Sequence, residues 1–325
     1  MYWTITEYME MAFRDLGHQL EFFDYRSFMI PGRLRDRIPA FNAWDLKRIN
    51  RRLYSKIQEY KPDFFFVIGG YTLEPETIQA ARRGGAIAGI WNADYPYLFE
   101  RYLELGKYYD CFFASGKDAL SRCARAGLQS HWLPFACVPE IHRPVHLSSA
   151  DEKRFSSDIL FFGTPYSERI RLFQKLTEFN LAIWGPGWDR LPVGHSLRPF
   201  IRGGPLKTQE WVKAVSGTKI AINYMGSSGF DMDPAKESMA NSRVFELLGC
   251  GAFQLVDAKE DLKALFRSGS EMVWFTKDEE VVDIARYYLS HPEERKAIGQ
   301  RAREAALKTH TYRHRVEEML KVLGM

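Results

Sequence analysis

Cysteine is scarce in this chain of 325 residues, and none of its four cysteines forms a C-x-x-C pair. Structural zinc sites and disulfide frameworks need closely spaced cysteines, so neither is predicted. The sequence also has no apolar run near the roughly 20 residues of a membrane span. Its first residues lack the basic and then apolar pattern of a signal segment. We therefore expect a cytoplasmic protein without a membrane span.

Excess charge of one sign is also missing, because 45 basic and 41 acidic residues leave a net charge of +4 that is spread along the chain. Nucleic-acid-binding domains concentrate positive charge on one face, so nucleic acid is not an expected partner. The cluster of Arg48, Arg51 and Arg52 is typical of a solvated helix face. It could also attract an acidic acceptor or a membrane surface.

Short apolar segments alternate with segments of helical periodicity along the chain, and this alternation predicts parallel sheets with crossover helices. The expected strands are 20–23, 64–68, 87–91, 111–114, 131–133, 159–162, 181–184, 220–224, 253–256 and 272–275. The expected helices are 5–16, 44–59, 74–82, 117–126, 168–176, 209–215, 262–266, 279–289, 293–307 and 312–322. This pattern predicts an α/β protein of two doubly wound, Rossmann-like domains, residues 1–142 and 143–325, facing a central cleft. The linker is expected within 139–151, and the last helix could pack back on the first domain.

The start of the chain departs from this pattern. Thr4 and Glu7 have the spacing of a capping box, so the sequence opens directly with a helix. A doubly wound domain normally begins with a central strand. Either the true start lies upstream of Met1, or another segment takes the place of that strand, and the sequence leaves both open.

The segment 241–257 has the pattern of a short helix, a glycine turn and a buried strand. Asn241 or Ser242 would cap the helix, whose free N–H groups favour a phosphate. Arg243 and Glu246 are three residues apart and share one face. Arg243 could contact the phosphate, and Glu246 could accept hydrogen bonds from sugar hydroxyls. The alternative is an ordinary amphipathic helix with an internal ion pair between these two residues.

Two glycine turns follow buried strands in the second half. Gly163 would let the backbone approach a ligand, while Thr164 holds a phosphate or sugar oxygen, and Arg169 in the next helix could reach a diphosphate. Gly185 and Gly187 would form an open loop in which the base of a nucleotide could contact backbone groups. The alternatives are plain turns between strand and helix, and a surface ion pair for Arg169.

Several separated segments occur in one order: 158–169, 183–188, 219–224, 241–246, 250–252, 291–295 and 310–315. With them, residues 158–320 resemble the C-terminal domain of the spore-maturation (CgeB-like) glycosyltransferases, a branch of the GT-B superfamily. In the first half the likeness rests on 61–63, 91–96 and 133–136. The resemblance implies a site for the nucleotide-sugar donor made by Gly163, Thr164, Arg169, Gly185, Gly187, Tyr224, Asn241, Ser242, Arg243 and Glu246.

The resemblance also implies that the nucleotide sugar is a substrate and that the acceptor is a separate molecule. Because the sequence has no credible metal-binding constellation, we expect no metal and no cofactor. Retaining GT-B enzymes often have two glutamates with seven residues between them. Glu237 and Glu246 have one residue too many between them, so retention or inversion stays open. The D-x-D pair of Asp231 and Asp233 is interpreted as a loop, without a metal.

Asp94 follows an expected strand and is the candidate catalytic base; the alternative is an aspartate that starts a turn or caps a helix. His310 and His314 are four apart and could ligate a metal, but a role at a helix start is favoured. The predicted activity is glycosyl transfer, of the hexosyltransferase kind. A nucleotide-sugar 2-epimerase and a non-catalytic nucleotide or glycan binder are the alternatives. The base, the sugar, the acceptor and the oligomeric state are not specified by the sequence.

Overall fold

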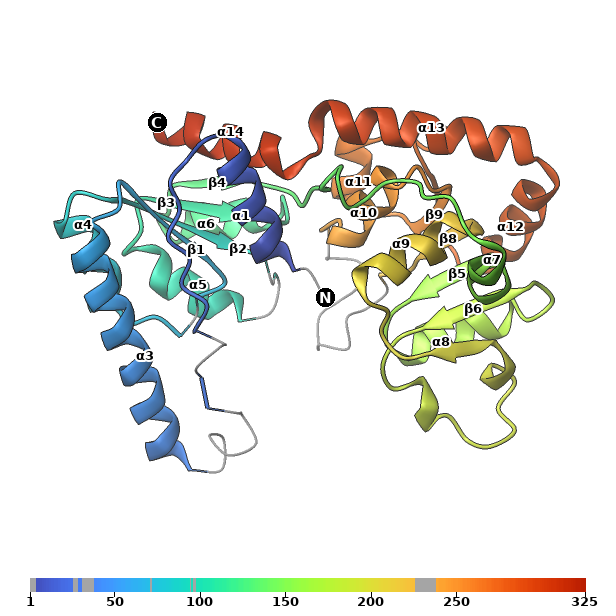
Figure 1. Ribbon diagram of the computed structural model, residues 1–325, viewed down its shortest axis with the longest axis horizontal. Coiled ribbons are helices and arrows are strands. Elements are labelled where there is room, and N and C mark those ends of the chain that lie inside the picture. Colours follow the sequence, from blue (N-terminus) through green and yellow to red (C-terminus); the bar gives the residue numbers. More distant parts are fainter. Residues whose placement is uncertain are drawn as a thin grey trace. The chain divides into compact units, whose positions relative to one another are not determined.

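The computed structural model describes residues 4–25, 29–30, 38–70, 72–93, 95, 98–225 and 238–325. The chain divides into two compact units, whose elements are labelled in Figure 1. The N-terminal unit comprises residues 9–134 and 316–325. The C-terminal unit comprises residues 135–315 together with the first residues up to Tyr8. No helix in the described part of the chain combines the length and apolarity that a bilayer span requires.

The N-terminal unit contains one parallel sheet in the order β1-β2-β3-β4. Its strands are β1 (Phe64–Ile68), β2 (Ile87–Asn92), β3 (Cys111–Ala114) and β4 (Ser130–Trp132). Its helices are the part of α1 (Ile5–Asp15) from Met9 onward, α3 (Pro39–Tyr60), α4 (Pro75–Arg83), α5 (Phe99–Gly106) and α6 (Ala119–Arg125). The order does not reverse among the described strands, so this sheet has the winding of one half of a doubly wound sheet.

Burial explains why these strands were predictable. In β2, Ala88, Ile90 and Trp91 are fully buried, as expected for a parallel strand covered on both faces. The expected strand 20–23 is wrong, because those residues belong to no strand. Phe22 there remains 36% exposed and Glu21 pairs with Lys56 of α3. Among the described residues, this segment therefore has no neighbouring strand with which its backbone could pair.

The C-terminal unit contains a parallel sheet in the order β10-β9-β8-β5-β6-β7. Its strands are β5 (Ser157–Phe162), β6 (Leu181–Trp184), β7 (Ile201–Gly203), β8 (Thr218–Asn223), β9 (Gln254–Asp257) and β10 (Val273–Phe275). Its α-helices are α7 (Ser149–Phe155), α8 (Ser167–Gln174), α9 (Thr208–Ser216), α10 (Ser242–Gly249), α11 (Glu260–Leu265), α12 (Glu280–Ser290), α13 (Pro292–Thr309) and the start of α14 (Tyr312–Leu323), with short 3-10 turns η2 (Trp188–Arg190) and η3 (Arg198–Phe200). The strand order reverses between β5 and β8, so this sheet is doubly wound.

Helices cover both faces of this sheet. Ile159 and Phe161 of β5 belong to one buried cluster, which includes residues of α8, α12 and α13. Leu160 and Phe162 alternate with them and belong to a second cluster, with residues of α7, α9 and α10. This period of two places β5 in the middle of three layers. The carboxyl end of β5 is therefore held rigidly at the centre of the unit.

Candidate functional site

The reversal between β5 and β8 is the topological switch point of the C-terminal unit. In open parallel sheets, ligands bind beyond the carboxyl ends of the strands at such a point, because the two connections leave the sheet in opposite directions. Here β5 ends at Phe162 and β8 ends at Asn223, and the two strands pair in parallel. The residues that follow these two strands are therefore the first candidates for a ligand site.

Arg169 of α8 bridges the two strand ends. Its Nε donates to the carbonyl oxygen of Tyr224 at 3.1 Å and its Nη2 to that of Met225 at 3.2 Å. Its Nη1 lies 3.2 Å from Oγ1 and 3.3 Å from the carbonyl oxygen of Thr164. Burial lowers the pKa of the guanidinium. Arg169 thus fixes the loops on both sides of the switch point, and it makes no ion pair with any described residue.

The glycines of the two turns let these loops approach closely. A Cβ atom on Gly185 would lie 2.1 Å from the carbonyl oxygen of Gly163, so the turns after β5 and β6 touch through their backbones. Gly187 has a φ of 88°, which favours glycine. Trp188, which follows it, is fully buried and donates from Nε1 to the oxygen of Gly163 at 2.7 Å. Trp188 is therefore a core residue in the structure.

Helix α10 begins where the sequence indicates. The Oδ1 atom of Asn241 accepts from the backbone N–H of Val244 at 3.2 Å, as an N-cap does. The same amide exchanges two hydrogen bonds with Asn223 at the end of β8, at 3.0 and 3.2 Å. Ser242 is the first helical residue and is partly buried. The start of α10 is thereby tied to the switch point.

Arg243 connects α10 to β5. Its Nη1 donates to the carbonyl oxygen of Phe162 at 2.6 Å, and its guanidinium lies 5.7 Å from the centre of that ring. Its Nε atom is enclosed and has no hydrogen-bond partner. Burial lowers the pKa of this side chain, whereas the nearby Glu246 raises it. A cation is thus held at the start of α10 with a donor that remains unused.

Glu246 has no hydrogen bond and no ion pair with any described residue. The alternative of an internal ion pair with Arg243 is therefore not supported by the geometry. Both charges are available to something else. The carboxylate nevertheless acts on its surroundings: burial is the main cause of the raised pKa of Tyr8, and Glu246 adds to it. Burial lowers the pKa of His142, and Glu246 partly opposes that shift.

Tyr224 has partners within the fold. Its ring lies 5.9 Å from Phe275, and its hydroxyl contacts Asp278 at 3.5 Å. Burial is the main cause of the raised pKa of this hydroxyl. Near the switch point, Tyr224 contributes its backbone carbonyl oxygen, which accepts a hydrogen bond from Arg169.

Sequence reasoning missed Asp257 and Lys259 at the end of β9. The Oδ1 atom of Asp257 accepts from the N–H of Met225 at 2.7 Å, and Oδ2 lies 3.5 Å from Lys259 Nζ. Both residues are less than a tenth exposed. The available signal was an acidic residue directly after an apolar strand, the same signal that selected Asp94. The charge of Asp257 also raises the pKa of Arg169, so Asp257 interacts electrostatically with the residue that bridges the two strand ends.

Some predicted residues lie outside the described residues. These are the candidate base Asp94, the D-x-D pair Asp231 and Asp233, and Glu237. Within the described ranges, no group of three or more histidine, cysteine, aspartate or glutamate side chains is arranged to hold a metal ion.

The two C-terminal histidines have structural partners. His314 Nδ1 lies 2.6 Å from Thr311 Oγ1, at the start of α14. His310 Nδ1 lies 2.9 Å from Arg315 Nη2. Burial lowers the pKa of His310 to about 3, and the neighbouring Arg315 adds to the shift. The predicted role at a helix start is thus confirmed for His314.

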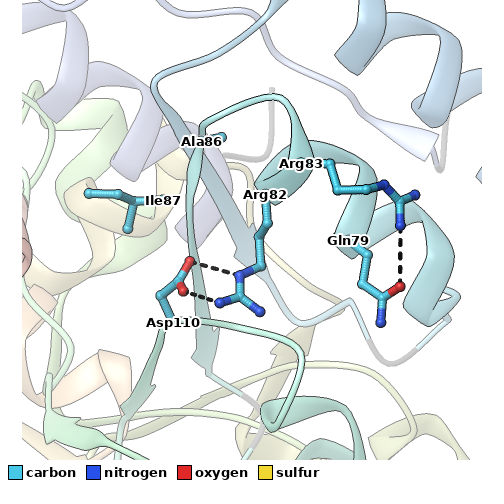
Figure 2. Close-up of a pocket in the computed structure, with 6 residues that line it drawn as sticks. All are labelled: Gln79, Arg82, Arg83, Ala86, Ile87 and Asp110. Carbon is cyan, nitrogen blue, oxygen red and sulfur yellow. Dashed lines mark hydrogen bonds and ion pairs between the residues drawn. The ribbon is translucent and has the colours of Figure 1, made fainter.

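A separate hollow of about 490 Å³ lies in the N-terminal unit, lined by Gln79, Arg82, Arg83, Ala86, Ile87 and Asp110. Figure 2 shows Arg82 pointing at Asp110. Ile87 begins β2 and Asp110 precedes β3, so this hollow lies at the amino ends of the strands. Arg82 already pairs with Asp110 and Arg83 donates to Gln79, and parallel sheets bind ligands at the opposite edge. We therefore place the candidate site at the switch point of the C-terminal unit.

Sequence comparison finds two matches. A family model described as glycosyl transferase-like matches residues 169–321. The spore protein CgeB of Bacillus subtilis strain 168 is 24% identical over 250 residues, which are 74% of this chain and 76% of the relative. The family model's match includes the β8 and α10 segments described above.

Structure comparison finds similar folds at low identity. Sucrose-phosphate synthase from Thermosynechococcus elongatus has a TM-score of 0.62 at 10% identity, over 86% of this chain and 77% of that one. A glycosyltransferase from Rickettsia africae has a TM-score of 0.62 at 10% identity, over 98% and 92%. HepE from Anabaena, in complex with UDP-glucose, has a TM-score of 0.60 at 10% identity, over 85% and 82%. The chain has the GT-B fold, as predicted.

Proposed function

We propose that this chain, a GT-B protein similar to the CgeB-like glycosyltransferases, moves a sugar from a nucleotide-diphosphate donor to an acceptor hydroxyl. A hexose is the donor sugar to expect. The observation that carries the proposal is the switch point, where the start of α10, the cation of Arg243 and the unpaired carboxylate of Glu246 lie on one short helix. This combination suits a ligand with both a diphosphate and sugar hydroxyls.

The start of α10 and Arg243 would stabilise the diphosphate. The first amides of a helix have no intrahelical partner, and the helix dipole adds positive potential there. Asn241 satisfies the amide of Val244, and no described residue accepts from the amides of Ser242 and Arg243, which leaves them to a ligand. Since negative charge builds up on the leaving diphosphate, these groups would act mainly in the transition state.

Glu246 would accept hydrogen bonds from sugar hydroxyls, because an ionised carboxylate offers only acceptors. Arg169, Asp257 and the glycines at 163 and 185 would hold the loops that surround the ligand. Their side chains and backbones are bonded across the switch point, so the site is organised before the ligand arrives.

Two further parts of the proposal concern chemistry. Positive charge from α10 and Arg243 would replace a divalent metal at the diphosphate, so transfer is metal-independent and needs no cofactor. Asp94 would act as the base that takes the acceptor proton. The acceptor is a glycan, a protein or a small molecule.

The ligands of the structural neighbours suggest the first donors to test. HepE has been crystallised with UDP-glucose and a trehalose-6-phosphate protein of E. coli with UDP-2-fluoro glucose. Incubation with UDP-, GDP- and dTDP-sugars, followed by NMR of the sugar products, tests the proposal. Release of the nucleoside diphosphate with sugar transfer or hydrolysis supports it. Inversion at C2 without release would support a 2-epimerase, and binding without any turnover would support a binding protein.

A further inference from the structure

Helix α3 of the N-terminal unit carries a large share of the exposed apolar side chains. Ten large apolar residues in the described part of the chain are at least 36% exposed. Four of them lie on α3 or directly before it: Ile38, Trp44, Tyr54 and Tyr60. Single exposed apolar side chains are common on protein surfaces, whereas apolar groups gathered on one element mark an interaction surface.

The same helix is basic. It contains five lysines and arginines but only two acidic residues. One of the two acids, Asp45, is fully buried and pairs with Arg48. The side chains of Lys47 and Arg51 make no hydrogen bond or ion pair with any described residue. These two cations are therefore available to a partner.

The exposed aromatic rings and the available cations share one face of α3. Six exposed residues follow one another at alternating spacings of four and three, which keeps them on one side of a helix: Ala40, Trp44, Lys47, Arg51, Tyr54 and Gln58. We call this set the aromatic–basic stripe. It contains no acidic residue, and at 1.5 Å per residue it is about 27 Å long.

The opposite face of α3 is fixed to its own unit. Asn50 is 2% exposed, and its Nδ2 donates to the carbonyl oxygen of Thr72 at 3.2 Å. Its Oδ1 accepts from the N–H of Glu74 at 2.8 Å and from Thr77 Oγ1 at 3.0 Å. Figure 1 shows that the first half of α3 extends beyond the strands of this unit. The aromatic–basic stripe therefore cannot rotate inward and stays exposed.

Trp44 is held in place although it is exposed. Its ring stacks on Phe41, with 5.7 Å between centres and 7° between planes. The guanidinium carbon of Arg48 lies 5.6 Å from the centre of the same ring. The side chain is nevertheless 54% exposed. A ring that is already ordered loses little conformational entropy when a partner covers it.

A lipid surface matches both kinds of group in the stripe. Anionic headgroups attract lysine and arginine, and tryptophan and tyrosine favour the boundary between headgroups and acyl chains. An acidic protein would match the cations but gives no reason for exposed aromatic rings between them. A basic, aromatic helix face of this length is typical of helices that lie along a membrane surface.

We propose that the aromatic–basic stripe of α3 binds the surface of an anionic lipid bilayer, with the helix lying along that surface. Lys47 and Arg51 pair with headgroup phosphates, and Trp44 and Tyr54 place their rings at the boundary with the acyl chains. The attachment is reversible, because two cations and two rings give modest affinity. This inference goes beyond the proposed function, since it requires no nucleotide.

Vesicle flotation with the full chain tests the proposal. One set of vesicles contains phosphatidylcholine alone, and the other contains about 30% phosphatidylglycerol as the anionic lipid. We expect the protein to float with the anionic vesicles at low salt, to float less at high salt, and to stay behind with phosphatidylcholine alone. Failure to float with anionic vesicles at low salt would overturn the proposal.

A double variant removes the two cations. We expect Lys47→Gln with Arg51→Gln to lower the ratio of bound to free protein about 30-fold, or about fivefold for each cation. The matched control is Lys296→Gln with Lys308→Gln, which removes the same charge from exposed positions of α13 that have no partner among the described residues. Equal losses in the two double variants would show attraction by net charge alone and would contradict the assignment to α3.

Trp44→Ser tests the aromatic part of the stripe. We expect its binding to anionic vesicles to be roughly tenfold weaker, because the ring area that leaves water on binding is lost. Tyr287→Ser, which removes an aromatic ring of α12 that is 47% exposed, is the control. Thermal unfolding checks that both variants fold. If Trp44→Ser floats as well as Tyr287→Ser does, the ring does not enter the bilayer and the proposal fails.

Soluble polyglutamate represents an acidic protein as the alternative partner. If the parent protein binds polyglutamate but does not float with anionic vesicles, the stripe belongs to an acidic protein and the lipid proposal is wrong. None of these measurements contains a nucleotide, so their outcomes leave the proposed function to its own test.

Discussion

Arg243 and Glu246 lie one helical turn apart on α10, yet each is used differently. The guanidinium donates to the carbonyl oxygen of Phe162, whereas the carboxylate makes no ion pair with a described residue. Burial lowers the pKa of Arg243, and a buried charge without an ion pair costs free energy. Keeping the charges apart therefore has a cost in stability and leaves both available to a ligand.

We expect Glu246→Ala and Arg243→Ala each to weaken nucleotide binding by about 1 to 3 kcal/mol, because the ligand groups they contact would be left unpaired. Calorimetry with the best nucleoside diphosphate measures this. Glu260→Ala, which removes an exposed carboxylate on α11, is the control. If both variants bind every nucleotide as the parent does, the donor site has been misplaced.

Asp94 gives a different prediction, because a base acts mainly in the transition state. Asp94→Asn should lower kcat roughly a hundredfold or more and leave nucleotide affinity nearly unchanged. Steady-state transfer kinetics and calorimetry on the same variant separate the two effects. A turn-starting aspartate would tolerate asparagine, so near-normal transfer would remove Asp94 from the catalytic residues.

Parts of the site were predictable and parts were not. Asn241 was recognised because capping depends on local residue type, and Arg243 and Glu246 because helical spacing is local. The contact between Tyr8 and His142 could not be predicted, since only the folded chain brings together residues so far apart. The roles predicted for the individual donor-site residues stay predictions until binding is measured.

At the scale of elements, the two turns after β5 and β6 act as one structure. Trp188 Nε1 donates to the oxygen of Gly163, and the turns approach each other at Gly185. A side chain at position 185 would meet a backbone oxygen, which cannot rotate away. The turn after β5 is therefore shaped partly by its neighbour.

We expect Gly185→Ala to destabilise the protein by about 1–3 kcal/mol, because a Cβ atom 2.1 Å from the Gly163 oxygen forces the backbone to move. Gly204→Ala is the control, since a Cβ atom there has no neighbour within 4 Å. Urea unfolding of both variants measures the difference. Equal midpoints for both would show that the turns separate without cost.

The elements themselves were largely predictable. Runs such as Ile159–Phe162 are apolar at every position, as strands covered on both faces require. Strand β7 was missed, because Ile201–Gly203 is short, lies at a sheet edge and contains one apolar residue. Segment 20–23 was wrongly assigned, since local aromatic content cannot show whether a neighbouring strand exists.

At the scale of the molecule, buried histidines couple stability to pH. His310 has a folded pKa of about 3, compared with 6.5 as its ordinary value. Between these values the unfolded chain binds a proton that the folded chain does not. Stability should therefore be complete above about pH 6.5 and should fall as the pH drops toward 3, by up to about 1.4 kcal/mol per pH unit.

Urea midpoints at pH 7.5, 6.5 and 5.5 test this, a range in which most carboxylates stay ionised. His310→Asn keeps an acceptor for Arg315 but cannot be protonated, so its midpoint should depend less on pH. An unchanged pH dependence in this variant would assign the effect to other groups.

Metal dependence is also a property of the whole protein. We expect donor turnover to be unchanged in EDTA, because α10 and Arg243 supply the positive charge at the diphosphate. The assay is transfer or hydrolysis of the best nucleotide sugar with and without chelator. Complete loss that manganese or magnesium restores would return Asp231 and Asp233 to consideration.

Tyr8, in the first helix, packs against His142 and Tyr312. It therefore needs partners from near the middle and from near the end of the chain. Contacts between residues so distant in sequence form late, because the intervening chain must first be ordered. At a synthesis rate of about 5–20 residues per second, Tyr8 leaves the ribosome roughly 15 to 60 seconds before Tyr312. The amino end of α1 must therefore wait for most of the protein to be made, and it can pack against these partners only after translation has nearly finished.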